Sequence, residues 1–136
     1  TLTGVVRIDQ LMTISDVGRP INPELVRTQL SGASIMMASI SMSEEIKYDP
    51  DGQLLNPGLA LYRIFGFEDS PRTVFADMVR DEGDDVPRGV GESGTFCVAP
   101  AIASAIHDAV GVWMSDLPIR PEDVLKAMEE AEDERA

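Results

Sequence analysis

Cysteine and histidine are almost absent from this chain, which has one of each, Cys97 and His107. A disulfide within the chain needs two cysteines, and an iron–sulfur cluster is usually held by four thiolates. A metal centre built from several histidines is excluded in the same way. The chain alone therefore has no disulfide framework, no iron–sulfur site and no multi-histidine metal centre. We expect Cys97 to fill a small buried position and His107 to lie at the surface or its boundary.

Positive charge is also scarce, because 11 Lys and Arg residues stand against 24 Asp and Glu residues, for a formal net charge of -13. Clustered cations are needed to bind phosphate backbones, so this charge argues against nucleic acid and anionic membrane surfaces as partners. The sequence has no apolar run of about 18 residues and no cationic leader with an apolar core. We therefore expect no membrane span and a cytoplasmic location.

The 136 residues have the length of a single domain, residues 1–136, and 43% of them are hydrophobic, which is enough for a core. The pattern predicts an α+β fold. It combines a small mixed sheet, a long helix rich in small residues, a glycine loop that leads into a helix, and a C-terminal helix. The β-rich stretch 3–15 predicts a long strand or a hairpin, and 73–79 predicts another strand. Asp49-Pro50-Asp51-Gly52 predicts a hairpin turn, and 59–67 is ambiguous between helix and loop.

A long helix is predicted to start after Asn22, a good N-cap, with Pro23 at its first position, and to run to about Glu45. One apolar stripe follows its length, formed by Val26, Leu30, Ala33, Met37 and Ile40. This stripe and the many small residues beside it predict a closely packed core helix.

Three more elements are predicted in the last third of the chain. Pro100 suits the first position of a helix that Gly111 ends. A short strand is predicted at 113–119. Pro121 opens the last helix, and the acidic residues from Glu129 onward predict a frayed tail.

Three glycines surround one carboxylate in the stretch Gly89-Val90-Gly91-Glu92-Ser93-Gly94. Glycine lets another group approach the main chain closely, and the helix that follows points its free N–H groups back toward the loop. This geometry would place Glu92 beside an anionic cofactor. The stretch also has the GxGxxG spelling of dinucleotide-binding loops, although the charged residues 81–88 before it do not resemble a buried strand. A plain tight turn and a nucleotide-binding module therefore stay open as alternatives.

Several blocks resemble the xanthine dehydrogenase/aldehyde oxidase family, the molybdenum hydroxylases. They keep the family's order and cover nearly the whole chain: Asp16-Val17-Gly18-Arg19-Pro20-Ile21-Asn22-Pro23 (D-x-G-x-x-[IV]-N-P), Gln29-Leu30-Ser31-Gly32 (Q-x-x-G), Glu44-Glu45 with the turn Asp49–Gly52, Gly89-Val90-Gly91-Glu92 with Ala99–Ala103 and Ala109–Gly111, and Leu117–Leu125. The resemblance implies that the chain is the C-terminal part of the large subunit, which binds molybdopterin.

In this family the glutamate that matches Glu92 acts as a general base toward water or hydroxide at the molybdenum centre. The resemblance therefore implies that Glu92 is catalytic in the oxidative hydroxylation of an aldehyde, a purine or an N-heteroaromatic substrate. It also implies that Gln29, Gly89, Gly91 and Ser93 contact the molybdopterin or its cytosine dinucleotide form. No residue of this chain is expected to ligate the metal.

The family's molybdenum subunits are several times longer than this chain, so the resemblance implies that the chain is inactive alone. Its expected partners are the remaining molybdopterin-binding segment or subunit, and the parts that carry iron–sulfur clusters and FAD. Relatives usually carry Gln-Gly four residues after the Q-x-x-G block, where this chain has Met36-Met37, and a thioether donates no hydrogen bond. A non-catalytic structural or interaction domain that has lost cofactor binding is therefore the alternative function.

Overall fold

The computed structural model describes residues 3–79, 83 and 85–134. Its elements are β1 (Gln10–Asp16), α1 (Pro23–Met42), α2 (Leu59–Tyr62), β2 (Thr73–Val79), α3 (Val98–Val110) and α4 (Pro121–Asp133). The fold is α+β, as the sequence predicts. Within the described ranges, however, the sheet has two strands that run parallel, so it is not mixed.

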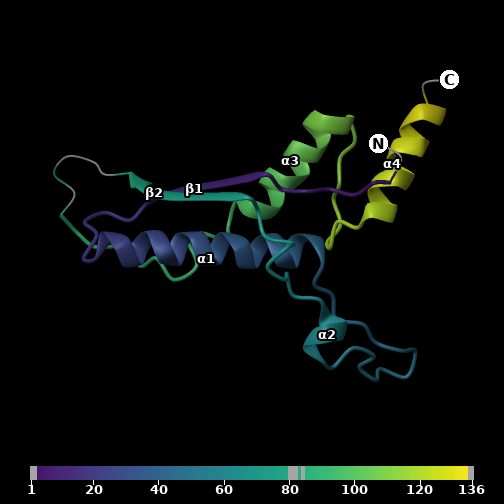
Figure 1. Ribbon diagram of the computed structural model, residues 1–136, viewed down its shortest axis with the longest axis horizontal. Coiled ribbons are helices and arrows are strands. Elements are labelled where there is room, and N and C mark those ends of the chain that lie inside the picture. The colour runs from purple at the N-terminus through teal and green to yellow at the C-terminus, as the bar shows by residue number, and fades with distance from the viewer. Residues whose placement is uncertain (1–2, 80–82, 84, 135–136) are drawn as a thin grey trace.

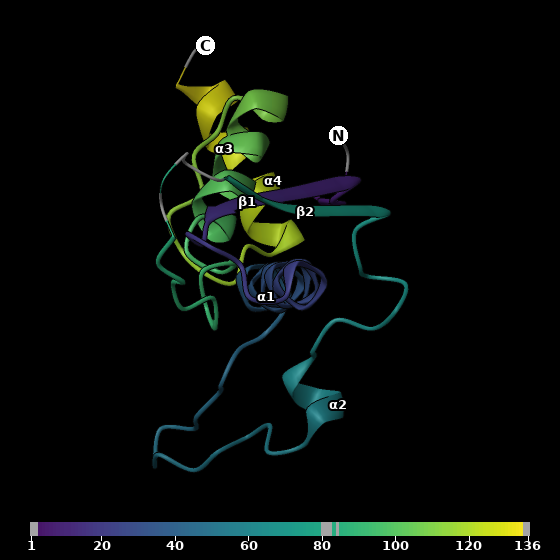
Figure 2. The same ribbon diagram turned by 90° about the vertical axis from the view of Figure 1, so that its left-hand side faces the viewer.

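The two strands and α1 form a βαβ unit. Gln10 lies opposite Thr73 and Asp16 opposite Val79, so β2 pairs with β1 along its whole length. Parallel strands need a crossover, and α1 provides it by running along one face of the pair. In Figures 1 and 2, α1 lies below the strands, whereas most of α3 and α4 extends above them.

The strand predicted at 73–79 is confirmed, but the one predicted at 3–15 is only partly right. Residues before Gln10 are not in a strand, because β2 begins at Thr73, opposite Gln10, and has no residue to pair with them. The short strand predicted at 113–119 is also wrong. Those residues are irregular, and no strand in the described part of the chain pairs with them.

The long helix is confirmed, and α1 ends at Met42 rather than near Glu45. Asn22 is its N-cap, because its Oδ1 accepts a hydrogen bond from the Leu25 N–H at 3.1 Å. The buried side chains of α1 are Val26, Leu30, Ala33, Ser34, Ala38, Ser39 and Ser41. Small buried residues let other backbone segments come close to this helix, which matters for the site described below.

The core has two parts along α1. The larger cluster joins α1, α3, α4 and the start of β1: Leu11, Ala38, Val98, Ile102, Ile106, Val112, Ile119 and Val124. The smaller cluster is Val17, Val26 and Leu30, against which Ala76, Met78 and Val90 pack. Val90 belongs to the glycine-rich stretch, so that stretch lies over the smaller cluster. None of the helices within the described ranges has the length and apolarity to span a membrane.

Both C-terminal helices form, with boundaries that differ from the prediction. α3 starts at Val98, so Pro100 is its third residue, still in the first turn where no N–H partner is needed. Gly111 ends α3 in the left-handed region, with φ of 79°. α4 opens at Pro121, as predicted, but continues to Asp133. The tail predicted to fray from Glu129 is helical because Ala127, Met128 and Ala131 pack on the core.

The segment 44–72, here called the arm, projects away from α1 on the side opposite the sheet (Figures 1 and 2). The predicted hairpin is reduced to one bridge between Tyr48 and Leu54. Its turn is closed by Asp49, whose Oδ1 accepts hydrogen bonds from the N–H groups of Asp51 (3.0 Å) and Gln53 (2.7 Å). Large apolar side chains are exposed all along the arm: Ile46, Tyr48, Leu54, Leu55, Leu59, Leu61, Ile64 and Phe67.

Candidate functional site

The glycine loop, residues 87–95, is joined on its N-terminal side to the D-x-G block that follows β1. The Arg88 N–H donates to the carbonyl oxygen of Val17 at 3.0 Å, and Gly18 forms an antiparallel bridge with Pro87. The Arg88 guanidinium also pairs with the Asp16 carboxylate, 72 positions earlier in the sequence. Two of the blocks that carry the family resemblance therefore meet in space.

Gly18 is the residue that lets these two segments approach. Its φ is 58°, in the left-handed region that favours glycine, and a Cβ here would lie 2.0 Å from the Val86 carbonyl oxygen. That same carbonyl oxygen accepts a hydrogen bond from the Arg19 N–H at 3.3 Å. The glycine of the D-x-G block is thus needed for backbone contact with the chain that leads into the glycine loop.

The C-terminal side of the glycine loop rests on α1. Gln29 Nε2 donates to the carbonyl oxygen of Gly91 at 2.6 Å. Gly94 is packed so closely that a Cβ would lie 2.6 Å from the Leu30 carbonyl oxygen and 2.9 Å from Ala33 Cβ. The loop is therefore held on both sides of Glu92.

Glu92 is exposed, and its carboxylate makes no hydrogen bond or ion pair with any residue that the structure describes. Its backbone is ordered by a turn, since the Glu92 carbonyl oxygen accepts bonds from Thr95 N (2.9 Å) and Thr95 Oγ1 (2.8 Å). The neighbouring Ser93 hydroxyl makes a long contact of 3.4 Å with the Val90 carbonyl oxygen. The loop thus presents one carboxylate, with no partner of its own, on a fixed backbone.

A groove of about 430 Å³ opens between the stretches 17–29 and 87–91. Of the predicted site residues, Gln29 and Gly91 line it, whereas Gly89, Glu92 and Ser93 do not. Gly91, the residue before Glu92, lines it, together with the exposed apolar side chains of Ile21 and Leu25. Arg19 adds positive charge to the groove of a chain that is strongly acidic overall, whereas the charge of Arg88 is paired with Asp16. The groove therefore offers apolar surface, one cation and an exposed backbone, and it is lined by the residue that precedes Glu92.

The arrangement of a dinucleotide-binding loop is not found. Such a loop needs a strand just before it and a helix that opens at its last glycine. Here β2 ends at Val79, and α3 starts at Val98 rather than at Gly94. Gly94 itself faces the backbone of α1 and not an open phosphate site.

Other predicted features lie outside the groove. Cys97 is exposed as the N-cap residue of α3, so the prediction of a buried position is wrong. Burial at a helix start depends on which segment covers it, and the sequence alone does not specify that segment. His107 is half-buried and stacks on Trp113, with ring centroids 4.1 Å apart. Met36 is exposed and Met37 packs on the larger core cluster. Most of the acidic loop 81–85 lies outside the described residues.

A family model described as "Molybdopterin cofactor-binding domain" matches residues 1–71, just over half of the chain. The chain belongs to this family. It is 40% identical over 132 residues to the "Probable hypoxanthine oxidase XdhD" of Escherichia coli (strain K12), covering 95% of this chain and 14% of that protein. It is 36% identical over 130 residues to a probable xanthine dehydrogenase subunit of Bacillus subtilis (strain 168), covering 94% and 17%.

The fold of this molybdopterin cofactor-binding domain also matches solved structures. One is the aldehyde oxidoreductase from Desulfovibrio desulfuricans ATCC 27774, with a TM-score of 0.80 and 26% identity over 93% of this chain and 14% of that chain. The resemblance to the xanthine dehydrogenase/aldehyde oxidase family is thus confirmed. The domain spans only 14% to 17% of the length of these relatives.

The groove fits one side of a large, anionic cofactor such as molybdopterin. A Cβ added at Gly89 or Gly91 would meet no atom within 4 Å, so an incoming group can approach the main chain there. The exposed guanidinium group of Arg19 suits a phosphate. The described residues contain no group of three or more His, Cys, Asp or Glu side chains that could hold a metal ion.

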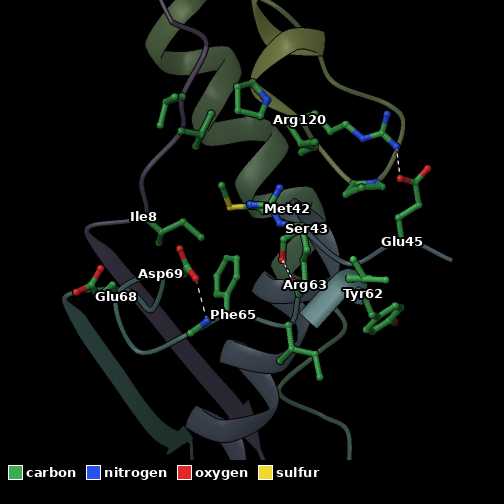
Figure 3. A pocket seen from close by; sticks show the side chains of 18 of the residues that line it. Ile8, Met42, Ser43, Glu45, Tyr62, Arg63, Phe65, Glu68, Asp69 and Arg120 are labelled. Atoms are coloured by element: carbon green, nitrogen blue, oxygen red, sulfur yellow. Dashed lines mark hydrogen bonds and ion pairs between the residues drawn. The ribbon is translucent and has the colours of Figure 1, made fainter. Parts of the chain in front are cut away.

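A larger cavity of about 770 Å³ lies elsewhere in this molybdopterin cofactor-binding domain, between the arm, residues 5–8 and the start of α4 (Figure 3). In its lining, the Glu45 carboxylate forms ion pairs with both Lys47 and Arg120. Desolvation raises the pKa of Glu45, but hydrogen bonds from Lys47 and Arg120 outweigh it and lower that pKa from its usual value. None of the predicted site residues lines this cavity, whereas Gln29 and Gly91 line the smaller groove, so we place the candidate site there.

Proposed function

We propose that this domain is part of a molybdenum-cofactor-dependent hydroxylase and supplies the catalytic glutamate, Glu92. The observation that carries the proposal is the exposed Glu92 carboxylate, which has no partner among the described residues. It stands on a loop that is held on both sides and whose Gly91 lines an open groove. A solvated surface turn does not need contacts that hold it on both sides in this way. Family membership adds that molybdopterin is the group bound by domains of this kind.

Glu92 acts as a general base in this proposal. A carboxylate within hydrogen-bond reach of a reacting oxygen can take its proton at the Oε atoms, and such a contribution is typically worth about 10² to 10⁴ in rate. When bound, the molybdenum cofactor would supply the oxygen-transfer and electron-accepting chemistry. This chain contributes Glu92 as the base and holds it in position, and it need not provide a metal ligand.

Gln29, Gly89, Gly91 and Ser93 contact the cofactor in this proposal. The two glycines leave the main chain of the loop open to a planar ring system or its substituents. Gln29 bonds to Gly91 through its Nε2, which leaves its amide oxygen without a partner among the described residues. Ser93 follows Glu92, and within the described part of the chain its hydroxyl has one long contact.

The rest of the molybdopterin-binding polypeptide, as a segment or a subunit, is the proposed main partner. The face of the β1–β2 pair that α1 does not cover exposes Met12 (67%), Ile14 (55%), Phe75 (47%) and Val79 (49%). Parallel sheets are normally covered on both faces, and a two-stranded sheet alone is marginal. We infer that this outer sheet face is covered by that polypeptide, and that iron–sulfur and flavin parts receive the electrons.

The substrate in this proposal is an aldehyde, a purine or an N-heteroaromatic compound. The groove does not select among them, since it is open on the side where the companion polypeptide would complete it. A non-catalytic domain of the same fold is the second candidate, and the exposed Met36 favours it. A thioether there cannot offer the amide hydrogen bonds of the Gln-Gly pair that is usual in the family.

Native mass spectrometry of the protein purified from its source tests this proposal. We expect a mass that contains the companion polypeptide and one molybdenum cofactor for each copy of this chain. A complex that carries neither molybdenum nor a pterin would support the non-catalytic domain instead. A bound nicotinamide or flavin nucleotide on this chain alone would contradict both.

A further inference from the structure

The peptide group that precedes Glu92 is held from α1. Gln29 Nε2 lies 2.6 Å from the Gly91 carbonyl oxygen, and a carbonyl can only accept, so the nitrogen end of the amide faces the loop. The Gly91 carbonyl and the Glu92 N–H share one planar peptide unit. Fixing that oxygen therefore fixes the plane that leads into the Glu92 Cα.

The peptide group that follows Glu92 is held as well. The Glu92 carbonyl oxygen accepts from both the N–H and the hydroxyl of Thr95, at 2.9 and 2.8 Å. With both flanking planes anchored, the position of the Glu92 Cα is set, and the carboxylate moves only through side-chain torsions. Of these anchors, only Gln29 comes from outside the loop itself.

Gly94 sets the height of the loop above α1. A Cβ there would lie 2.6 Å from the Leu30 carbonyl oxygen. The buried Ser34 hydroxyl lies 2.7 Å from that oxygen and 3.2 Å from the Gly94 carbonyl oxygen, and it has only one proton to donate. The shorter contact takes that proton, so Thr13 donates to Ser34 across 2.5 Å. Gly94 is thus seated mainly by close packing.

We propose that Gln29 is a positioning residue, which acts on the reaction by holding the Glu92 backbone through the Gly91 carbonyl. This inference rests on the proposed function of Glu92, and it gives Gln29 a second task, carried by its Nε2, in addition to the proposed cofactor contact. The hydrogen bond from Gln29 to Gly91, here called the clamp, matters because a displacement of about 1 Å in a catalytic group can lower the rate about 10²-fold. Binding of substrate does not pass through the clamp, so its loss affects kcat and not KM.

The test uses the assembled molybdenum protein that contains this chain, with three variants. Gln29→Leu removes the donor at similar size, and Gln29→Lys keeps a donor that can reach the Gly91 carbonyl. Gln53→Leu makes the same chemical change at an exposed glutamine on the arm. The readouts are molybdenum content, kcat and KM, and hydrogen exchange of the Thr95 amide, which is bonded to the Glu92 carbonyl.

We expect Gln29→Leu to keep its molybdenum, to exchange the Thr95 amide at least 5-fold faster, and to lose about 10- to 100-fold in kcat at unchanged KM. Gln29→Lys should have an exchange rate and a kcat close to those of wild type, and Gln53→Leu should behave as wild type. Unchanged exchange or unchanged kcat in Gln29→Leu would overturn the proposal. Loss of molybdenum would overturn it too, because the lower rate would then come from the missing cofactor and not from the position of Glu92.

The proposed role of Glu92 as base and the proposed role of Gln29 as positioning residue can be tested independently. Glu92→Gln leaves the Gln29–Gly91 bond in place, so its Thr95 amide should exchange as in wild type. Full turnover in that variant would contradict the proposed role of Glu92, whereas faster exchange in Gln29→Leu would still report the clamp.

Discussion

Asp16 at the end of β1 and Arg88 at the start of the glycine loop form an ion pair that joins two distant sequence blocks. The same Asp16 oxygen accepts a hydrogen bond from the Gly18 N–H at 3.0 Å. One carboxylate thus closes the turn after β1 and anchors the loop that carries Glu92. Because both side chains are about half exposed, the charge interaction itself is screened by solvent.

Substitutions at Asp16 should separate the two roles of this carboxylate. Asp16→Asn keeps an acceptor for Gly18 and should cost about 0.5 kcal/mol in free energy of unfolding, whereas Asp16→Ala loses both contacts and should cost about 1 to 2 kcal/mol. Urea denaturation measures both. Asp108→Ala, at an exposed site on α3, should stay within about 0.5 kcal/mol. Equal costs for the two Asp16 variants would show that only the charge matters.

Gly18 and Gly52 offer a matched pair of glycines with positive φ. A Cβ at Gly18 would lie 2.0 Å from a backbone oxygen, whereas nothing lies within 4 Å of one at Gly52. Gly52→Ala should therefore cost only the backbone strain of about 1 kcal/mol. Gly18→Ala must also displace the chain before the glycine loop and should cost more than about 3 kcal/mol. Chemical denaturation that gave similar losses would contradict the close approach of the two segments.

Stability at low pH should depend on Asp77 of β2. A hydrogen bond from the Met78 N–H, with the bond and charge of Arg27, lowers the pKa of Asp77 below its ordinary 3.8, although partial desolvation opposes this. The ionised carboxylate therefore stabilises the fold above that ordinary value, and the contribution is lost as the pH falls through the lower folded-state pKa. Asp77→Asn should flatten the dependence of unfolding free energy on pH below about 4. A curve as steep as wild type would rule out this contribution.

The outer sheet face should be sensitive to charge when the companion polypeptide is present. Ile14→Glu or Phe75→Glu would bury an unpaired carboxylate in the proposed contact, at a cost of several kcal/mol. Each should reduce the amount of companion polypeptide that co-purifies by at least about 10-fold. Ser104→Glu, at an exposed position on α3, serves as the control for added charge. Normal co-purification of both sheet variants would mean that this face is not the contact.

Local signals in the sequence predicted much of this fold. Asn22 and Pro23 fix the start of α1, and Gly111 ends α3, because caps depend on neighbouring residues alone. The strand at 73–79 has an alternating pattern that matches the observed β2. These elements needed no knowledge of which segment would pack against them.

Features that depend on distant segments were mispredicted or missed. Within the described ranges, residues 113–119 have the composition of a strand but no strand beside them, and no described segment covers the helix start at which Cys97 lies. The close packing of Gly94 on α1 was missed, because Gly94 and Leu30 come together only in the folded chain. The Asp16–Arg88 ion pair could have been predicted from the sequence, because an acidic residue stands next to one glycine-containing block and a basic residue next to the other. The groove that Gln29 and Gly91 line likewise needed the structure.

Turnover of Glu92→Gln in the assembled, metal-loaded protein tests the central claim most directly. The account predicts that molybdenum content stays at the wild-type level while kcat falls by at least about 10²-fold, because an amide cannot accept the proton as a carboxylate does. Glu68→Gln, at an exposed glutamate on the arm, should leave kcat unchanged. Wild-type kcat in Glu92→Gln with full molybdenum content would contradict the assignment of Glu92 as the base.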